Sequence, residues 1–135
     1  FGGKIFYQDD PEKIWYAGGR VNIRKARISH IGLRKLDSNE FSNLTETDYI
    51  TGCCLFTTPK VIKKLNGFDE QFNMYGEDVD LCLRARNAGI NCYFVPEARL
   101  WHHVSASIGG NWSLGKLMRK FSSLIKLYQK HNIKK

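Results

Sequence analysis

The chain has 135 residues, of which 42% are hydrophobic and 25% are charged, values typical of one globular domain with a core of its own. No apolar run approaches the roughly 18 residues of a membrane span, and the chain opens on Phe1-Gly2-Gly3 with no signal-peptide pattern. The net charge is +8, and the basic residues concentrate in segments 20–35 and 116–135. A basic surface of this kind suits nucleic acid, a nucleotide-sugar diphosphate, an anionic glycan or an anionic membrane. Neither segment carries a nucleic-acid motif.

Four short extended segments are predicted in the first third of the chain. They are Lys4–Tyr7, Ile14–Ala17, Arg20–Ile23 and Ser29–Leu33. The second and third meet at Gly18-Gly19, a dipeptide typical of a tight turn. The polar stretch Asp37–Glu46 is predicted to be a surface loop.

A buried strand and a short helix are predicted next. Tyr49–Phe56 is apolar and partly β-branched, which is typical of a buried strand. Thr58 and Pro59 fit the N-cap and the first position of a helix, and Asn66-Gly67 fits its end.

The central helix is predicted over residues 77–88. Small and apolar residues recur along it at helical spacing, and Gly89 follows as a stop signal. Glu77 and Asp78 lie in or just before its first turn, where exposed N–H groups and the helix dipole stabilise carboxylates. Helix capping alone explains acids at this place, so local sequence does not assign them any chemistry.

Two extended segments surround the only proline after this helix. A strand over Asn91–Val95 is predicted to end at Pro96, and Arg99–Val104 is predicted to be extended. Ser105–Asn111 is predicted to be a flexible loop that contains glycine.

The four cysteines show no C-x-x-C spacing. They are Cys53, Cys54, Cys82 and Cys92. Adjacent cysteines in a strand point to opposite faces and cannot easily bridge each other. We expect four buried, reduced thiols in a cytosolic protein.

Residues 112–135 are predicted to form a basic amphipathic helix, set apart from the unit formed by residues 1–111. Its apolar positions recur at helical spacing: Leu114, Leu117, Met118, Phe121, Leu124, Ile125 and Tyr128. Most of the basic residues lie off this face. Such a stripe packs on the domain, packs on a part of the fold that is missing, or lies on an anionic membrane, and the sequence leaves these alternatives open.

Several motifs follow one another in a characteristic order. They are Thr51-Gly52-Cys53-Cys54, Gly67-Phe68-Asp69-Glu70, Gly76-Glu77-Asp78-Val79-Asp80-Leu81, Val95-Pro96 and His102-His103. This order closely resembles the second half of family 2 glycosyltransferases, and most of all their rhamnosyltransferase-like branch. The resemblance covers roughly residues 1–110. It implies an α/β fold, the acceptor-side part of the nucleotide-diphospho-sugar transferase (GT-A) fold, with a mixed sheet and packed helices but without the nucleotide-binding half.

The resemblance assigns chemistry to two carboxylates and one histidine. Glycosyl transfer needs a base that takes the proton of the acceptor hydroxyl, and a positive group that stabilises the departing diphosphate. The second acid of the family's Glu-Asp pair is the base of an inverting reaction, which places this role on Asp78 and leaves Glu77 to support acceptor binding or cap the helix. A histidine that follows a tryptophan completes the metal site of related enzymes, so His102 is the expected ligand of Mg²⁺ or Mn²⁺. His103 points the other way in an extended segment and is the weaker choice.

Asp78-Val79-Asp80 spells the Asp-x-Asp metal signature of the family but does not fit that role. The signature normally ends a strand, whereas these two acids are predicted in a helix and diverge by about 200°. Asp80 is instead spaced to pair with Arg84. The nucleotide-binding signature is absent from the 135 residues. The divalent cation is therefore expected only with the missing half present, and the fragment alone is expected to be inactive.

Seven further residues are expected near the substrate: Trp15, Gly18, Gly19, Thr51, Gly52, Tyr75 and Gly76. For the first three, a packed tryptophan beside a glycine turn is the structural alternative. The expected function is transfer of a sugar, with dTDP-rhamnose as the leading donor, to a hydroxyl of a glycan or glycolipid, in the cytoplasm and at the membrane periphery if the C-terminal helix binds there. The alternatives are a basic nucleic-acid-binding module and a non-catalytic glycan-binding domain.

Overall fold

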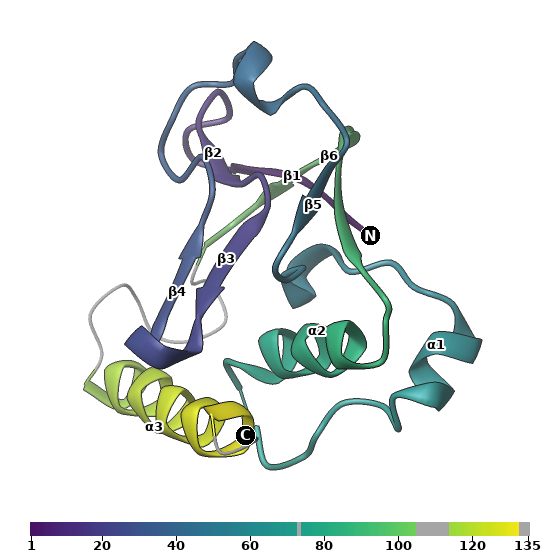
Figure 1. The fold of residues 1–135 in the computed structure, drawn as a ribbon. Coiled ribbons are helices and arrows are strands. Elements are labelled where there is room, and N and C mark those ends of the chain that lie inside the picture. The colour runs from purple at the N-terminus through teal and green to yellow at the C-terminus, as the bar shows by residue number, and fades with distance from the viewer. Residues whose placement is uncertain (73, 105–113, 133–135) are drawn as a thin grey trace.

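A computed structural model describes residues 1–72, 74–104 and 114–132 of the protein, which form a mixed α/β arrangement (Figure 1). Its strands and helices are β1 (Gly2–Tyr7), β2 (Ile14–Tyr16), β3 (Gly19–Asn22), β4 (Arg27–His30), β5 (Thr45–Thr47), α1 (Pro59–Lys64), α2 (Glu77–Asn87), β6 (Cys92–His102) and α3 (Leu114–Asn132). Short 3₁₀ turns occupy Ile23–Lys25, Asn39–Phe41 and Gly52–Cys54. The predicted α/β class is confirmed. The predicted loop at Ser105–Asn111 lies outside the described residues.

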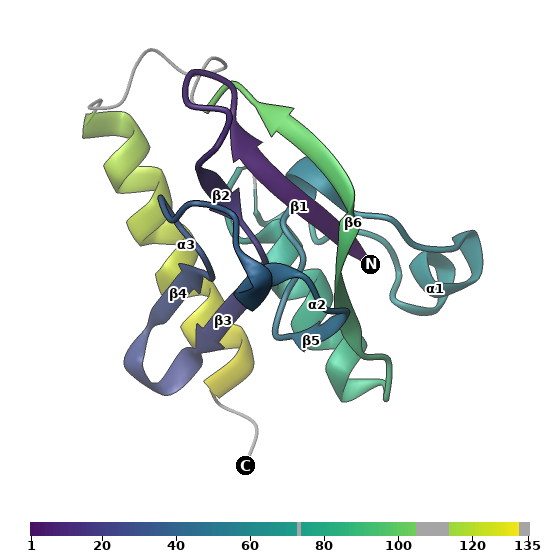
Figure 2. The ribbon, with the colours of Figure 1, turned by 90° about the horizontal axis from the view of Figure 1, so that it is seen from above.

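The main sheet is mixed, as predicted, with the strand order β2-β1-β6-β5. β1 pairs in parallel with β6, while β2 and β5 are antiparallel to their neighbours. A separate antiparallel hairpin joins β3 to β4, with Gly19 opposite His30. Figure 2 shows this hairpin alongside α3, while α1 lies at the opposite end of the molecule.

Strand β6 continues through Pro96, so the prediction that it ends there is wrong. The register against β1 jumps between Gly3, which faces Val95, and Lys4, which faces Arg99. Proline has no N–H to donate, and a bulge removes it from the hydrogen-bonded ladder without ending the strand. Gly3 makes the bulge possible, because a Cβ there would lie 2.4 Å from the carbonyl oxygen of Ala98.

Two further predictions fail between the hairpin and α1. Tyr49–Phe56 is not a strand, because the chain turns after Ile50 into a 3₁₀ turn whose start is capped by Thr51, with its hydroxyl accepting from the amide of Cys53 at 3.4 Å. The predicted surface loop over Asp37–Glu46 holds a 3₁₀ turn that buries Phe41, and it runs into β5.

The helical signals are confirmed at α1 and α2. Thr58 caps α1 by accepting from the amide of Val61 at 3.3 Å, and Pro59 occupies its first turn. Asn66 and Gly67 follow with φ of 58° and 68°, the left-handed backbone that ends helices. Helix α2 covers all but the last of the predicted residues.

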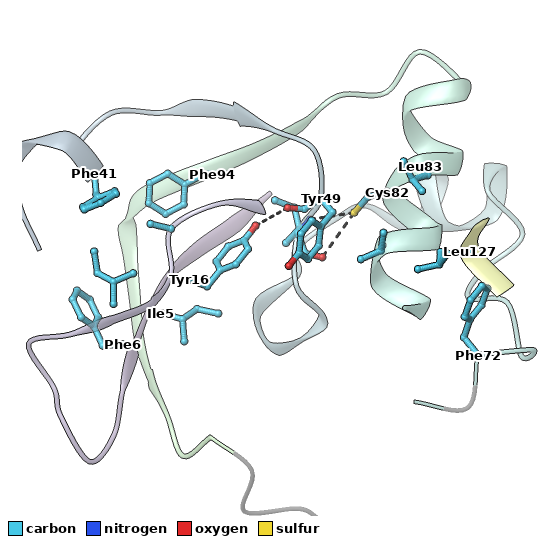
Figure 3. Close-up of a cluster of buried hydrophobic side chains, with 14 residues drawn as sticks. Ile5, Phe6, Tyr16, Phe41, Tyr49, Phe72, Cys82, Leu83, Phe94 and Leu127 are labelled. Atoms are coloured by element: carbon cyan, nitrogen blue, oxygen red, sulfur yellow. Dashed lines mark hydrogen bonds between the residues drawn. The ribbon is translucent and has the colours of Figure 1, made fainter. Parts of the chain in front are cut away.

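The core joins the sheet to α2 and α3. The Tyr16 hydroxyl donates to the carbonyl of Tyr49 at 2.7 Å (Figure 3). The amide of Ile50 donates to the sulfur of Cys82 at 3.2 Å. Both contacts satisfy polar groups inside the core. The four cysteines are free thiols, but Cys53 is exposed and only Cys82 is fully buried, so the prediction of four buried thiols is wrong.

Helix α3 contacts the rest of the domain through one edge. Leu127 and Ser123 are buried there, and Lys130 and His131 both reach the carboxylate of Asp80 at 2.8 Å. The predicted apolar stripe faces away from this edge, and six of its residues are exposed: Leu114, Leu117, Met118, Phe121, Ile125 and Tyr128. The alternative in which the stripe packs on the domain is therefore wrong for the described residues, because ion pairs orient the helix. No helix in the described part of the chain is both long and apolar enough to cross a membrane.

Candidate active site at the start of helix α2

The loop before α2 has a backbone that few residues adopt. Tyr75 and Gly76 have φ of 74° and 91°, and a bulky residue such as tyrosine rarely tolerates a positive value. Packing against α3 holds the loop in place: a Cβ on Gly76 would lie 3.1 Å from a methyl group of Leu127 and 3.3 Å from the ring of Phe72. Strain of this kind often accompanies functional sites, and here it aims the two acids that follow.

Asp78 is held by backbone amides on both of its oxygens. One oxygen accepts from Val79 at 2.8 Å, and the other accepts from Gly52 at 2.9 Å. The second contact crosses from α2 to the turn that Thr51 caps, so the structure brings together Asp78, Gly52 and Thr51, three of the residues expected at the site. The carboxylate is partly buried, and it lies at the positive end of the helix dipole.

Glu77 has a different environment from its neighbour. One of its carboxylate oxygens is buried and has no hydrogen-bond partner among the described residues. Burial raises the pKa of Glu77, and the charge of Asp78 raises it further, while backbone amides at Glu77 and Tyr75 partly offset the rise. Glu77 therefore holds a proton more readily than an ordinary glutamate does, as acid groups of active sites commonly do.

Asp80 is a structural residue. It is fully buried, and its oxygens lie 2.7 Å from Arg84, as the four-residue spacing predicted, and 2.8 Å from both Lys130 and His131. Burial raises its pKa, but the hydrogen bonds from these three residues outweigh burial and lower the pKa to about 2. Its oxygens are thus occupied by the side chains of Arg84, Lys130 and His131, which agrees with rejecting Asp78-Val79-Asp80 as a metal signature.

A second group of predicted residues gathers on the sheet. The rings of Trp15 and His102 lie 5.1 Å apart, because β1 joins β2 to β6 and sets Tyr7 opposite His102. Burial lowers the pKa of His102, and the neighbouring His103 lowers it further, so the imidazole is neutral at pH 7. His103 itself is exposed and lies 3.5 Å from Asp9.

Gly18 and Gly19 are buried, and close packing accounts for both. Gly18 has φ of 104°, and the amide of Gly19 donates to the hydroxyl of Thr47 at 2.6 Å. A Cβ on Gly19 would lie 2.1 Å from the ring of Tyr49. The structure thus gives these glycines contacts within the domain, in line with the structural alternative.

His30 links the two groups and was not singled out by the sequence. The centre of its ring lies 4.5 Å from the ring centre of Trp15 and 6.1 Å from that of Tyr49. Its Nδ1 lies 3.0 Å from the carbonyl oxygen of Trp15. Burial lowers the pKa of His30, and the charge of Asp78 partly offsets this effect. Asp78 also raises the pKa of Tyr49, after the larger effect of burial. A lone histidine in a short predicted strand gives no local indication that aromatic rings from distant segments will surround it.

Comparison with known proteins identifies the family. The model described as "Glycosyltransferase like family 2" matches residues 20–120, about three quarters of the chain. The chain belongs to this glycosyltransferase family. Its mixed sheet with packed helices fits a GT-A-like fold, and no solved structure gave a significant match.

Curated relatives of the chain confirm the resemblance to the rhamnosyltransferase-like branch. An N-acetylglucosaminyl-diphospho-decaprenol L-rhamnosyltransferase of Mycobacterium tuberculosis is 39% identical over 61 residues, 45% of this chain and 20% of the relative. Rhamnosyltransferase WbbL of Escherichia coli is 32% identical over 74 residues, 55% of this chain and 28% of the relative. The O-antigen biosynthesis protein RfbC of Myxococcus xanthus is 40% identical over 58 residues, 43% of this chain and 4% of the relative. The chain thus covers less than a third of each of these relatives.

The described part of the chain does not by itself fit a divalent cation. It contains no group of three or more His, Cys, Asp or Glu side chains that could hold a metal ion. His102 could supply one neutral imidazole ligand, but its ring contact is with Trp15. We therefore assign no chemical step to a cation held by these residues.

Proposed function

We propose that the protein is part of an inverting glycosyltransferase that moves a sugar from a nucleotide-diphospho-sugar to a hydroxyl of a glycan or glycolipid. dTDP-rhamnose is the leading donor, because two of the curated relatives are named as rhamnosyltransferases. The proposal places the reaction in the cytoplasm. A divalent cation would require donors besides His102, supplied from outside the described residues.

The position of Asp78 carries this proposal. A carboxylate fixed by the amides of Gly52 and Val79 is aimed without side-chain freedom, and it remains partly accessible at the start of α2. Positioning of this kind supplies much of an enzyme's rate enhancement.

The reaction follows as a single displacement. The acceptor oxygen attacks the anomeric carbon while its proton passes to the Asp78 carboxylate, and the bond from the anomeric carbon to the diphosphate breaks with its electron pair leaving on the diphosphate. Glu77 supports acceptor binding, because one of its carboxylate oxygens is buried and has no hydrogen-bond partner among the described residues. Trp15, Thr51 and Tyr75 remain predicted substrate contacts, together with Gly18, Gly19, Gly52 and Gly76.

Asp78→Asn tests the assignment in the longest natural polypeptide that carries this sequence. Asparagine keeps the shape and one acceptor oxygen but cannot take the proton, so transfer should fall at least roughly 100-fold while nucleotide-sugar binding persists. Glu97→Gln, which changes an exposed acid on β6, is the matched control and should transfer normally. Undiminished transfer by Asp78→Asn would show that the base is another residue. A parent protein that binds glycan but transfers nothing would favour the non-catalytic alternative.

A further inference from the structure

We propose that His30 binds the acceptor sugar, with its Nε2 accepting a hydrogen bond from a hydroxyl other than the one that reacts. The proposal rests on the proposed function, because it adds a contact to the site built around Asp78. His30 is the last residue of β4, and its side chain is partly buried. None of the motifs that carry the family resemblance contains it.

Three aromatic rings fix the orientation of the His30 ring. The ring centres of Trp15 and Tyr16 lie 4.5 Å and 5.2 Å away, with their planes at 84° and 87° to the imidazole. The ring centre of Tyr49 lies 6.1 Å away. These contacts come from β2 and from the segment after β5, so they hold the ring from two parts of the fold. A ring held in this way loses little rotamer freedom when a ligand binds.

The contact to Trp15 decides which ring nitrogen can accept a hydrogen bond. Nδ1 of His30 lies 3.0 Å from the carbonyl oxygen of Trp15, and because a carbonyl can only accept, Nδ1 carries the proton. Burial lowers the pKa of His30, so the ring is neutral at pH 7 and Nε2 keeps its lone pair. Within residues 1–72, 74–104 and 114–132, no hydrogen bond occupies Nε2, and the buried side-chain atom without a partner belongs to Glu77. Nε2 is therefore available to a hydroxyl donor.

His30 lies in the same part of the molecule as Asp78. After the larger effect of burial, the charge of Asp78 acts on the pKa of both His30 and Tyr49. Three residues after Tyr49, the amide of Gly52 donates to the carboxylate of Asp78 at 2.9 Å. In a single displacement the acceptor and the leaving group lie on opposite faces of the donor sugar. Because Asp78 is the proposed base, a group that shares its surroundings lies on the acceptor side.

Helix α3 borders this region on another side. The charge of Lys120 also lowers the pKa of His30, and its ammonium lies 5.4 Å from the ring centre of Tyr75, in the loop before α2. The 3₁₀ turn at the tip of the β3–β4 hairpin contacts α3, which holds the hairpin beside the helix (Figure 2). His30 thus lies among the elements that present Asp78 and Lys120, where an acceptor sugar would meet them.

Two substitutions separate the roles of the two ring nitrogens. In His30→Asn, the side-chain amide can donate to the Trp15 carbonyl in place of Nδ1, but it is too short to replace Nε2. In His30→Gln, the longer side chain can present an oxygen near the position of Nε2. A residue that only packs would respond to both changes alike, whereas an acceptor-binding residue would respond mainly to the first.

Steady-state transfer from dTDP-rhamnose to octyl N-acetylglucosaminide tests this difference in the longest natural polypeptide that carries the sequence. The glycoside carries the sugar that appears in the name of the mycobacterial relative. His30→Asn should raise the KM of the glycoside roughly 3- to 10-fold, the effect of one lost hydrogen bond, and leave the KM of the nucleotide sugar unchanged. His30→Gln should restore most of the lost affinity. Ser29→Ala is the matched control and should behave like wild type, because neighbouring side chains of a strand point to opposite faces.

A ¹⁵N NMR titration of the same polypeptide, labelled at its histidines, reads the contact without turnover. The Nε2 signal of His30, assigned by its absence from His30→Gln, should be that of an unprotonated nitrogen and should move when the glycoside is added. A signal that does not move would overturn the proposal, as would an Nε2 already bonded to another part of the polypeptide. Equal KM values of the glycoside in wild type and His30→Asn would also overturn it.

The two proposals fail separately. A wild-type protein that shifts the His30 signal on adding the glycoside but transfers no sugar would contradict the proposed function and support this contact. Transfer that depends on Asp78 but not on His30 would support the proposed function and overturn the contact.

Discussion

Replacing Asp80 with asparagine should loosen α3 from α2 and destabilise the fold. Asp80 is fully buried, and its carboxylate lies within 2.8 Å of Arg84, Lys130 and His131. A neutral amide of the same shape cannot balance the cations that converge there. Removing one partner from a buried ion pair typically costs about 3–5 kcal/mol.

The pKa of Asp80 gives an independent magnitude. Hydrogen bonds from His131, Lys130 and Arg84 outweigh burial and lower this pKa from 3.8 to about 2. Because the folded state has the lower pKa, the ionised carboxylate stabilises the fold. This contribution is complete well above pH 3.8 and is lost as the pH falls from about 4 to about 2. The gap corresponds to about 2.5 kcal/mol at neutral pH.

Urea unfolding followed by circular dichroism at a series of pH values measures this effect. Asp80→Asn should lose about 3 kcal/mol at pH 7, and its difference from wild type should shrink as the pH approaches about 2. Asp10→Asn is the control. It removes an ion pair between Asp10 and Lys13, two side chains that are nearly half exposed, and it should change stability by less than about 0.5 kcal/mol. The reasoning is refuted if Asp80→Asn costs less than about 1 kcal/mol at pH 7, or if its deficit stays constant with pH.

Two more predictions use the same unfolding measurements. Gly19→Ala should destabilise the fold by about 1–3 kcal/mol, because its Cβ would lie 2.1 Å from the ring of Tyr49. The control Gly115→Ala in α3 meets no atom within 4 Å and should be neutral or slightly stabilising. Equal effects of the two substitutions would contradict the packing argument. Burial lowers the pKa of His30 below 6.5, so the neutral ring stabilises the fold above pH 6.5 and this contribution is lost as the pH falls through the folded value. In thermal melts, His30→Phe should therefore lose less Tm on acidification than wild type does. The control His103→Phe, at an exposed position, should match wild type. A steeper loss of Tm for His30→Phe would show that another group controls the dependence of Tm on pH.

Local signals predicted the elements that local contacts define. Thr58 caps α1 through its own helix, and the acids of α2 lie in the turn where the sequence placed them. The continuation of β6 through Pro96 depends on Gly3, more than ninety positions away in the chain. The outward orientation of α3 likewise depends on Asp80, a contact that no periodicity reveals.

The same contrast between local signals and long-range contacts applies to the candidate site. The sequence singles out Asp78 and Gly52 because each belongs to a short motif, and the structure joins them by one hydrogen bond. His30 was missed because its surroundings are built from the rings of Trp15, Tyr16 and Tyr49, which come from distant segments. Burial and the charge of Asp78 can be recognised there only after folding brings these segments together.

The two aspartates of α2 have separable roles that one pair of variants can distinguish. Asp80 holds α3, and Leu127 of α3 packs within 3.1 Å of where a Cβ on Gly76 would lie, so a loosened α3 should also release the loop that aims Asp78. Asp80→Asn should therefore lower transfer only together with a loss of stability, and substrate affinity should fall as well. Asp78→Asn should lower the transfer rate while stability and affinity remain close to wild type, because its contacts are to backbone amides that asparagine still partly satisfies. Matching losses of rate, affinity and stability in both variants would mean that Asp78, too, acts only through the fold.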